Sequence, residues 1–159
     1  MRRFITLIVI MGMVLIWTGC GGGGDGVSST WQVHTYNLTL GNGGALSDSS
    51  TDWLLLEFLA SPSQPYPNAI LSIDNASTVQ VGVPFDADDT QVNISFSTMF
   101  SQDWDHPCKV TLTALSLKQG GLISGSVSGN LYADLDDDGD DEAYPLTATF
   151  SNVPILVAP

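Results

Sequence analysis

The stretch Asp134–Glu142 (DLDDDGDDE) carries seven carboxylates in nine residues, and its spacing suits calcium. Carboxylates stand at the first, third, fifth and ninth positions, and Gly139 stands at the sixth. Calcium takes six to eight oxygen ligands, and this spacing would wrap alternate side chains around one centre while the glycine makes a sharp turn. Without a cation, like charges about 6 Å apart repel by roughly 0.7 kcal/mol per pair even in water. The sequence therefore predicts a structural calcium loop, and the alternative is a solvated acidic turn that keeps the chain soluble.

The loop is not an EF-hand, because position 12 is Pro145 and the flanking residues read as strands. It resembles instead the D-x-D-x-D-G-x-x-D loops that lie between strands of integrin-type propeller repeats. That resemblance implies side-chain ligands and one backbone carbonyl ligand. The side-chain ligands would be Asp134, Asp136, Asp138 and Glu142, and Asp140 would offer its carbonyl. The chain contains no repeat of the loop, so a propeller is excluded.

Two alternating runs flank the acidic stretch and predict the hairpin that carries it. In the first, LISGSVSGNLYA from Leu122, apolar residues share one parity, and serines and Asn130 share the other. The second, AYPLTATFSNVPI to Ile155, repeats this pattern around Leu146, Ala148 and Phe150. A turn rich in carboxylates between two such runs is typical of an exposed β-hairpin loop.

The rest of the chain after residue 30 contains strand patterns and almost no helix pattern. Turn signals separate the segments, Gly41–Gly44 and Asp74–Asn75 among them. The expected strands are 31–40, 53–60, 69–73, 78–83, 91–100 and 109–117, followed by the two runs of the hairpin. The segment 53–60 (WLLLEFLA) could also be a short helix, but the prolines that follow favour a strand. We therefore expect an all-β fold over 30–159, an antiparallel β-sandwich or barrel-like domain of seven or eight strands.

The first twenty residues predict export and anchoring. Arg2 and Arg3 precede an apolar run of 14 residues, Phe4–Trp17, and Thr18-Gly19-Cys20 follows. This arrangement resembles the signal and lipobox of bacterial lipoproteins, and the last 40 residues resemble small all-β lipoprotein domains of uncharacterised type. The resemblance implies a signal peptide over 1–19, acyl chains such as palmitate on Cys20, a glycine-rich tether over 20–29, and sorting to the outer membrane. Ordinary secretion with an unmodified Cys20 is the alternative.

The charge balance excludes one class of partner. The chain has four basic and 17 acidic residues, a formal charge of −13, and no basic patch. Such a surface repels phosphate backbones, so we expect no nucleic-acid partner. The function we expect is a non-enzymatic binding or structural module of the cell envelope, held to the membrane through Cys20, with an unknown protein or glycan partner.

Three further groups of residues keep other functions open. Asp105, His106 and Cys108 could ligate a transition metal, although a loop with a buried thiol explains them as well. The aromatic residues Trp53, Tyr66 and Trp104 could form a glycan-binding face, although strand aromatics usually belong to the core. A pocket placing His34 or His106 beside a carboxylate would favour an envelope hydrolase with an atypical site.

Overall fold

The computed structural model describes residues 26–48, 50–61, 63–87, 92–95, 99–103 and 105–157. The predicted signal peptide, Cys20 and residues 21–25 of the predicted tether lie outside these ranges. The described residues include no helix long and apolar enough to cross a membrane. The first strand begins at Ser28, slightly earlier than the expected domain start at residue 30. Ser29 is already buried, and its hydroxyl donates to the carbonyl of Leu40 at 2.8 Å.

The described chain is almost entirely β-structure, which confirms the all-β prediction. Eleven strands are joined by loops and by one short 3-10 helix, Ala76–Thr78. The first five strands are β1 (Ser28–Val33), β2 (Tyr36–Thr39), β3 (Asn42–Asp48), β4 (Trp53–Ser61) and β5 (Gln64–Asp74). The remaining strands are β6 (Phe85–Asp86), β7 (Val92–Ser95), β8 (Met99–Ser101), β9 (Lys109–Ala114), β10 (Leu122–Ala133) and β11 (Glu142–Val157).

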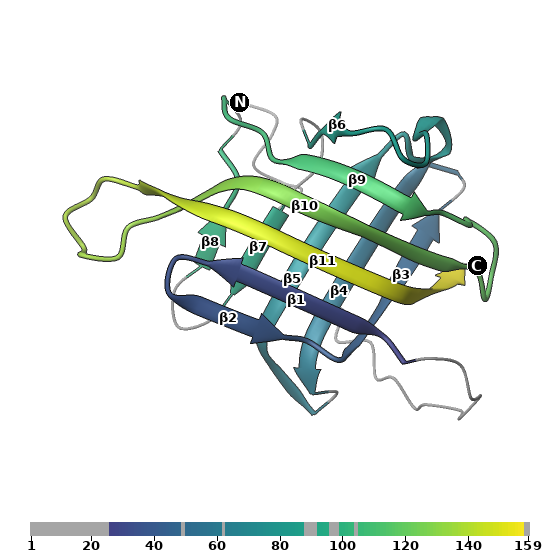
Figure 1. The fold of residues 1–159 in the computed structure, drawn as a ribbon, viewed down its shortest axis with the longest axis horizontal. Helices are drawn as coiled ribbons and strands as arrows, with labels where there is room; N and C mark the ends of the chain where they lie inside the picture. Colours follow the sequence, from purple (N-terminus) through teal and green to yellow (C-terminus); the bar gives the residue numbers. More distant parts are fainter. Residues whose placement is uncertain are drawn as a thin grey trace.

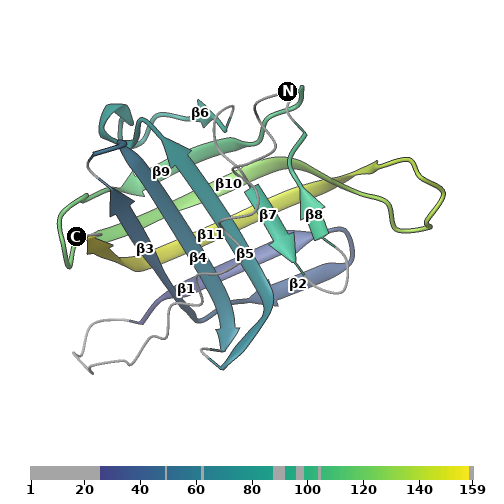
Figure 2. The ribbon, with the colours of Figure 1, turned by 180° about the vertical axis from the view of Figure 1, so that it is seen from behind.

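One sheet curls back on itself into two crossed layers. In Figure 1 the layer nearer the viewer contains β2, β1, β11, β10 and β9, and Figure 2 shows β3, β4, β5, β7 and β8 on the other side. The pairing order is β2-β1-β11-β3-β4-β5-β7-β8-β10-β9-β6, and β11 also pairs with β10. Most pairs are antiparallel, whereas β11 and β3 run parallel. The long strands β10 and β11 therefore belong to both layers.

These two strands bend where they change layer. β10 pairs with β9 through Ser124–Ser128 and then with β8 at Tyr132, and the intervening Gly129 has a φ of 153°. β11 changes partner from β1 to β3, and between these pairings one extra residue forms a bulge at Asn152, whose φ is 57°. Bends and bulges of this kind are how strands turn the corner between packed sheets.

The core lies between the layers and follows the alternation of the sequence. Leu54, Leu56 and Phe58 of β4 are fully buried, while the residues between them are only partly buried, so 53–60 is a strand as predicted. The predicted parity of the hairpin is confirmed as far as Phe150, and beyond the bulge at Asn152 it reverses, so that Val153 and Ile155 are buried. The buried apolar residues of the predicted parity are Ile123, Val127, Leu131, Ala133, Leu146, Ala148 and Phe150.

Several predicted boundaries were wrong. Residues 31–40 form not one strand but two, β1 and β2, because His34 takes a left-handed conformation (φ 52°) in the turn between them. The predicted turn at Gly41–Gly44 contains the start of β3. A Cβ on Gly43 would lie 2.5 Å from the carbonyl oxygen of Glu57, so glycine here permits close pairing with β4.

The strand expected at 78–83 is absent. The 3-10 helix Ala76–Thr78 and a turn replace it, and the carboxylate of Asp52 accepts hydrogen bonds from the backbone N–H and hydroxyl of Ser77, at 2.9 and 2.7 Å. Val81 and Val83 are about half exposed, at 52% and 49%, because no strand pairs with them. The expected strand 91–100 is also divided, into β7 and β8, and these divisions raise the count above the seven or eight predicted.

Candidate functional site

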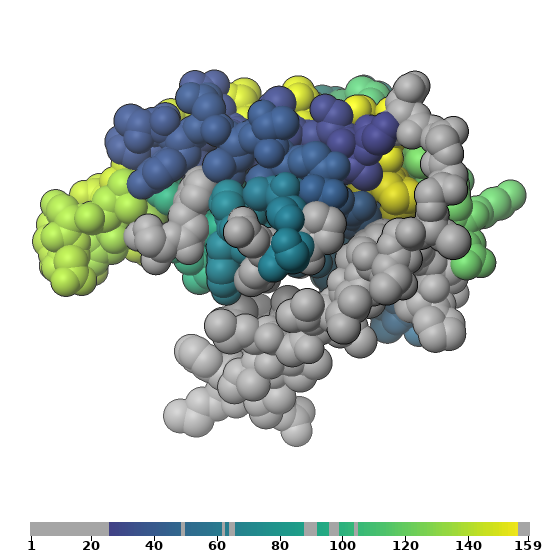
Figure 3. Space-filling model, turned by 90° about the horizontal axis from the view of Figure 1, so that it is seen from below, coloured from purple at the N-terminus to yellow at the C-terminus, as the bar shows by residue number. Residues whose placement is uncertain are grey.

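The acidic loop occupies the tip of the β10–β11 hairpin. The pairing of Ala133 with Glu142 closes the hairpin directly below it. The loop extends beyond both layers in Figure 1, and Figure 3 shows it projecting from the body of the domain. Most of its acidic residues are therefore exposed, although Asp134 and Glu142 at its two ends are partly buried, and the strands that hold the loop are anchored by the core.

Three of the five predicted calcium ligands converge. Single carboxylate oxygens of Asp134, Asp136 and Asp138 all lie within 4.8 Å of one another. Oxygens bound to one calcium ion at 2.3–2.6 Å can be separated by at most about 5 Å, so this arrangement fits a shared ion. The three oxygens would fill only part of its coordination shell, leaving the rest to backbone carbonyls and water.

The backbone of the loop explains the convergence. Asp137 and Gly139 have left-handed φ angles of 61° and 94°, so the chain curls and directs alternate side chains inward. The carboxylate of Asp134 accepts hydrogen bonds from the N–H groups of Asp138 (3.2 Å) and Gly139 (2.9 Å). These bonds hold Asp134 in position at the centre of the turn.

The carboxylate of Glu142, the fourth predicted side-chain ligand, does not join the converging group. Asp140 was expected to contribute its backbone carbonyl, and this role stays a prediction. The N–H of Asp140 donates to the carboxylate of Asp138 at 3.0 Å, and Glu142 accepts a hydrogen bond from the Tyr144 hydroxyl at 2.8 Å. A ligand role for Glu142 would require its carboxylate to leave Tyr144.

An aromatic cluster beneath the loop was not predicted from the sequence. The ring centroids of His34 and Tyr144 are 4.8 Å apart, those of Phe100 and Tyr144 are 5.6 Å apart, and those of Tyr36 and Phe100 are 5.9 Å apart. The only sequence signal was the inward parity of Tyr144, because strands far apart in the chain supply the other rings. The hydrogen bond to Glu142, burial, and the negative charges of Glu142, Asp136 and Asp134 together raise the pKa of Tyr144 to about 12.

This pKa predicts how the hairpin responds to alkali. Because the pKa of Tyr144 is higher in the folded chain than its ordinary value of about 10, folding opposes its deprotonation. The stabilising contribution of Tyr144 is complete below pH 10 and is lost as the pH rises from about 10 towards about 12. Titration of tyrosinate absorbance should show a late step that Tyr144→Phe removes and Tyr66→Phe leaves in place. A tyrosinate titration that Tyr144→Phe leaves unchanged would contradict the raised pKa of Tyr144.

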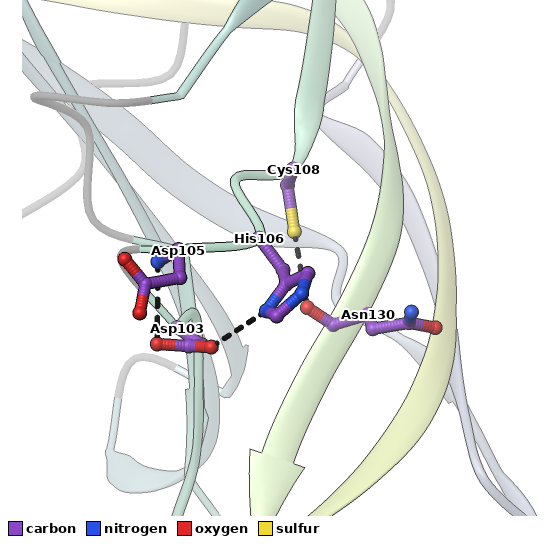
Figure 4. Close-up of polar contacts among 5 residues, drawn as sticks. All are labelled: Asp103, Asp105, His106, Cys108 and Asn130. Carbon is purple, nitrogen blue, oxygen red and sulfur yellow. Dashed lines mark hydrogen bonds and ion pairs between the residues drawn. The ribbon is translucent and has the colours of Figure 1, made fainter.

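The segment Asp103–Cys108 does not bring together the transition-metal ligands considered from the sequence (Figure 4). His106 Nδ1 lies 2.8 Å from a carboxylate oxygen of Asp103, whose other oxygen accepts the N–H of Asp105 at 3.3 Å. Cys108 is fully buried, and its Sγ donates to the carbonyl of Asn130 at 3.4 Å. Burial raises the pKa of Cys108 to about 11, so it is a thiol with little thiolate character.

The aromatic residues considered for glycan stacking do not form one platform within the described part of the chain. Trp104 lies outside that part. Trp53 is partly buried and donates its indole N–H to the hydroxyl of Ser72 at 2.6 Å, whereas Tyr66 is 52% exposed. The two lie near opposite ends of the β4–β5 hairpin, because Trp53 pairs with Asp74 and Tyr66 lies next to the turn near Ser61.

An open groove of about 410 Å³ crosses the outer face of β2, β1, β11 and β10. Eight of its twelve lining residues have uncharged polar side chains, and the other four are Trp31, Leu38, Val127 and Ala148. The eight polar residues are Thr30, Gln32, Asn37, Thr39, Ser126, Ser128, Thr147 and Thr149. Neither His34 nor His106 lines it. The sequence showed the alternation that exposes these residues, but not that four strands would place them side by side.

Comparison with protein-family models, curated proteins and solved structures finds no match to this chain.

Proposed function

We propose that the chain is a non-enzymatic binding or structural module of the bacterial cell envelope, held to the outer membrane by acyl chains on Cys20. Its β10–β11 loop binds a calcium ion that stabilises the hairpin. The convergence of Asp134, Asp136 and Asp138 within 4.8 Å carries the calcium part of this proposal. The anchor rests on the lipobox-like sequence that ends at Cys20.

Electrostatics favour a cation at this position. Two carboxylates 4.8 Å apart repel by about 0.9 kcal/mol even at the dielectric of water, and the loop holds three such pairs. A bound dication removes this repulsion and gains the attraction of each carboxylate. Calcium at about 100 times its dissociation constant would then add about 2.7 kcal/mol to the free energy of unfolding.

Thermal unfolding tests the calcium site. The full-length chain in detergent should melt roughly 10 °C higher in millimolar calcium than in EDTA, given the stabilisation expected for a domain of this size. Asp136→Ala should abolish the calcium-dependent shift. In EDTA the same variant should melt at or above the temperature of the unsubstituted chain, because it removes one of the repelling charges.

Asp141→Ala is the matched control, since it removes the same charge from the same loop but lies outside the converging group. This variant should retain most of the calcium-dependent shift. Identical melts in calcium and EDTA would reject the calcium site, and equal loss of the shift in both variants would show that only the total charge of the loop matters.

A further inference from the structure

The outer face of the layer built from β2, β1, β11, β10 and β9 carries a regular array of hydroxyl and amide groups. Cross-strand pairing aligns outward-facing residues in two rows that run perpendicular to the strands. The first row is Thr39, Thr30, Thr149, Ser126 and Thr111, and the second is Asn37, Gln32, Thr147, Ser128 and Lys109. The five members of the first row are all serine or threonine. Among the described residues, no other aligned row of this sheet consists of five hydroxyl side chains.

The geometry of a sheet makes this array periodic. Neighbouring strands lie about 4.8 Å apart, and outward-facing residues on one strand repeat about every 6.7 Å. The hydroxyls of Thr30 and Thr149 are 2.9 Å apart and share a hydrogen bond, so these two adjacent members of the row are in contact. The groove of about 410 Å³ lies over these rows and is within the roughly 300–1,000 Å³ range of ligand sites.

The charge distribution sets this face apart from the rest of the molecule. The chain has 17 acidic residues, but none stands among the row members on β2, β1, β11 and β10; the one acidic residue aligned with a row is Asp86 of β6, which pairs with Lys109 beyond the groove lining. The one charged member, Lys109, is at the β9 edge and forms an ion pair with Asp86. A chain with a formal charge of −13 repels anionic polymers, and a cationic ligand would prefer the acidic loop to an uncharged face. A neutral ligand is therefore favoured here.

We propose that this groove binds an extended, neutral polysaccharide, whose ring hydroxyls exchange hydrogen bonds with the serine, threonine, asparagine and glutamine side chains. The inference rests on the proposed role as a binding module and names the class of its ligand. Hydroxyl and amide side chains both donate and accept, so they can match the mixed pattern of sugar hydroxyls. A groove open at its surface suits a polymer that continues past its ends.

Affinity electrophoresis of the full-length chain in detergent tests the proposal. The gels contain one of three neutral polysaccharides (laminarin, galactomannan or dextran) or the anionic polymer polygalacturonate. We expect at least one neutral polysaccharide to retard the chain and polygalacturonate not to do so. Thr147→Glu should lower the affinity for that polysaccharide, measured from the retardation, by at least about tenfold. The bound ligand would cover the new carboxylate and remove its hydration.

The matched control is Thr113→Glu, which places the same charge on an exposed strand threonine outside the groove lining. This variant should bind as the unsubstituted chain does. Equal melting temperatures of the two variants establish that both are folded. No retardation by any of the three neutral polysaccharides, retardation by polygalacturonate alone, or equal binding by the two variants would each overturn the inference.

The same experiments test the calcium proposal independently of the polysaccharide proposal. Retardation is measured in calcium and in EDTA, and Asp136→Ala is included. Because the groove residues lie several residues along β10 and β11 from the loop, we expect Asp136→Ala to bind polysaccharide normally. Polysaccharide binding without any calcium-dependent melting shift would reject the calcium site and support the groove as a binding site. A calcium-dependent melting shift without polysaccharide binding would support the calcium site and reject the groove.

Discussion

Phe58→Ala is expected to lower the free energy of unfolding by about 3–5 kcal/mol, the usual range for removing a buried phenylalanine ring. Phe58 is fully buried in β4, and its ring centroid lies 5.2 Å from that of Trp31 and 5.4 Å from that of Phe150. Trp31 belongs to β1 and Phe150 to β11, so this ring joins the two layers. Its loss would leave a cavity that two large neighbouring rings cannot easily fill.

Chemical denaturation followed by tryptophan fluorescence measures this effect. Met99→Ala is the control, because Met99 is a large apolar residue that is 60% exposed, and its removal should change stability by no more than about 0.5 kcal/mol. If Phe58→Ala does not fold, Phe58→Leu should fold with a smaller loss. Equal effects of Phe58→Ala and Met99→Ala would show that the interface between the layers is not the main source of stability.

Gly129→Ala is expected to cost about 3 kcal/mol, although it adds only one methyl group. Two effects combine, since a φ of 153° is a conformation that residues with a side chain rarely adopt, and the added Cβ would lie 2.9 Å from both Cα and Sγ of Cys108. Backbone strain and overpacking each typically cost about 1–3 kcal/mol. The backbone atom cannot rotate away, so β10 must move.

The comparison with Gly41→Ala isolates the cause. Gly41 has open space around its Cβ position and no positive φ, so alanine there should be neutral or slightly stabilising. Both variants are compared by denaturant unfolding, and calcium-dependent melting is then measured on Gly129→Ala. A cost below about 0.5 kcal/mol at Gly129 would contradict the view that β10 turns its corner there.

These two positions also bear on function. Because β10 and β11 belong to both layers, the loop at their tip and the groove across their outer face depend on the same pair of strands. Loss of the corner at Gly129 should therefore disturb both proposed sites. Loss of the Phe58 ring acts mainly on stability.

The acidic loop and its hairpin were predictable because they are local. Asp134, Asp136 and Asp138 lie within five residues, so their spacing and a left-handed turn are enough to bring them together. Alternation likewise identified the buried faces of β10 and of β11 up to Phe150, since a strand places successive side chains on opposite sides. The segment of β4 shows no such alternation in its sequence, and only the prolines after it favoured a strand. The position of the Glu142 carboxylate was not predictable in this way, because it accepts a hydrogen bond from Tyr144 instead of joining the three aspartates.

The sequence by itself thus determined the all-β class, the hairpin and the converging aspartates, because each depends on interactions between near neighbours. Only the tertiary structure decided which strands pair, and with them the curled sheet, the corners at Gly129 and Asn152 and the aromatic cluster around Tyr144. The hydroxyl rows joining Thr30, Thr149 and Ser126 belong to this second group as well. Thr30 and Thr149 are 119 residues apart in the chain, and Ser126 and Thr149 are about twenty residues apart. No local spacing encodes a strand register over such separations.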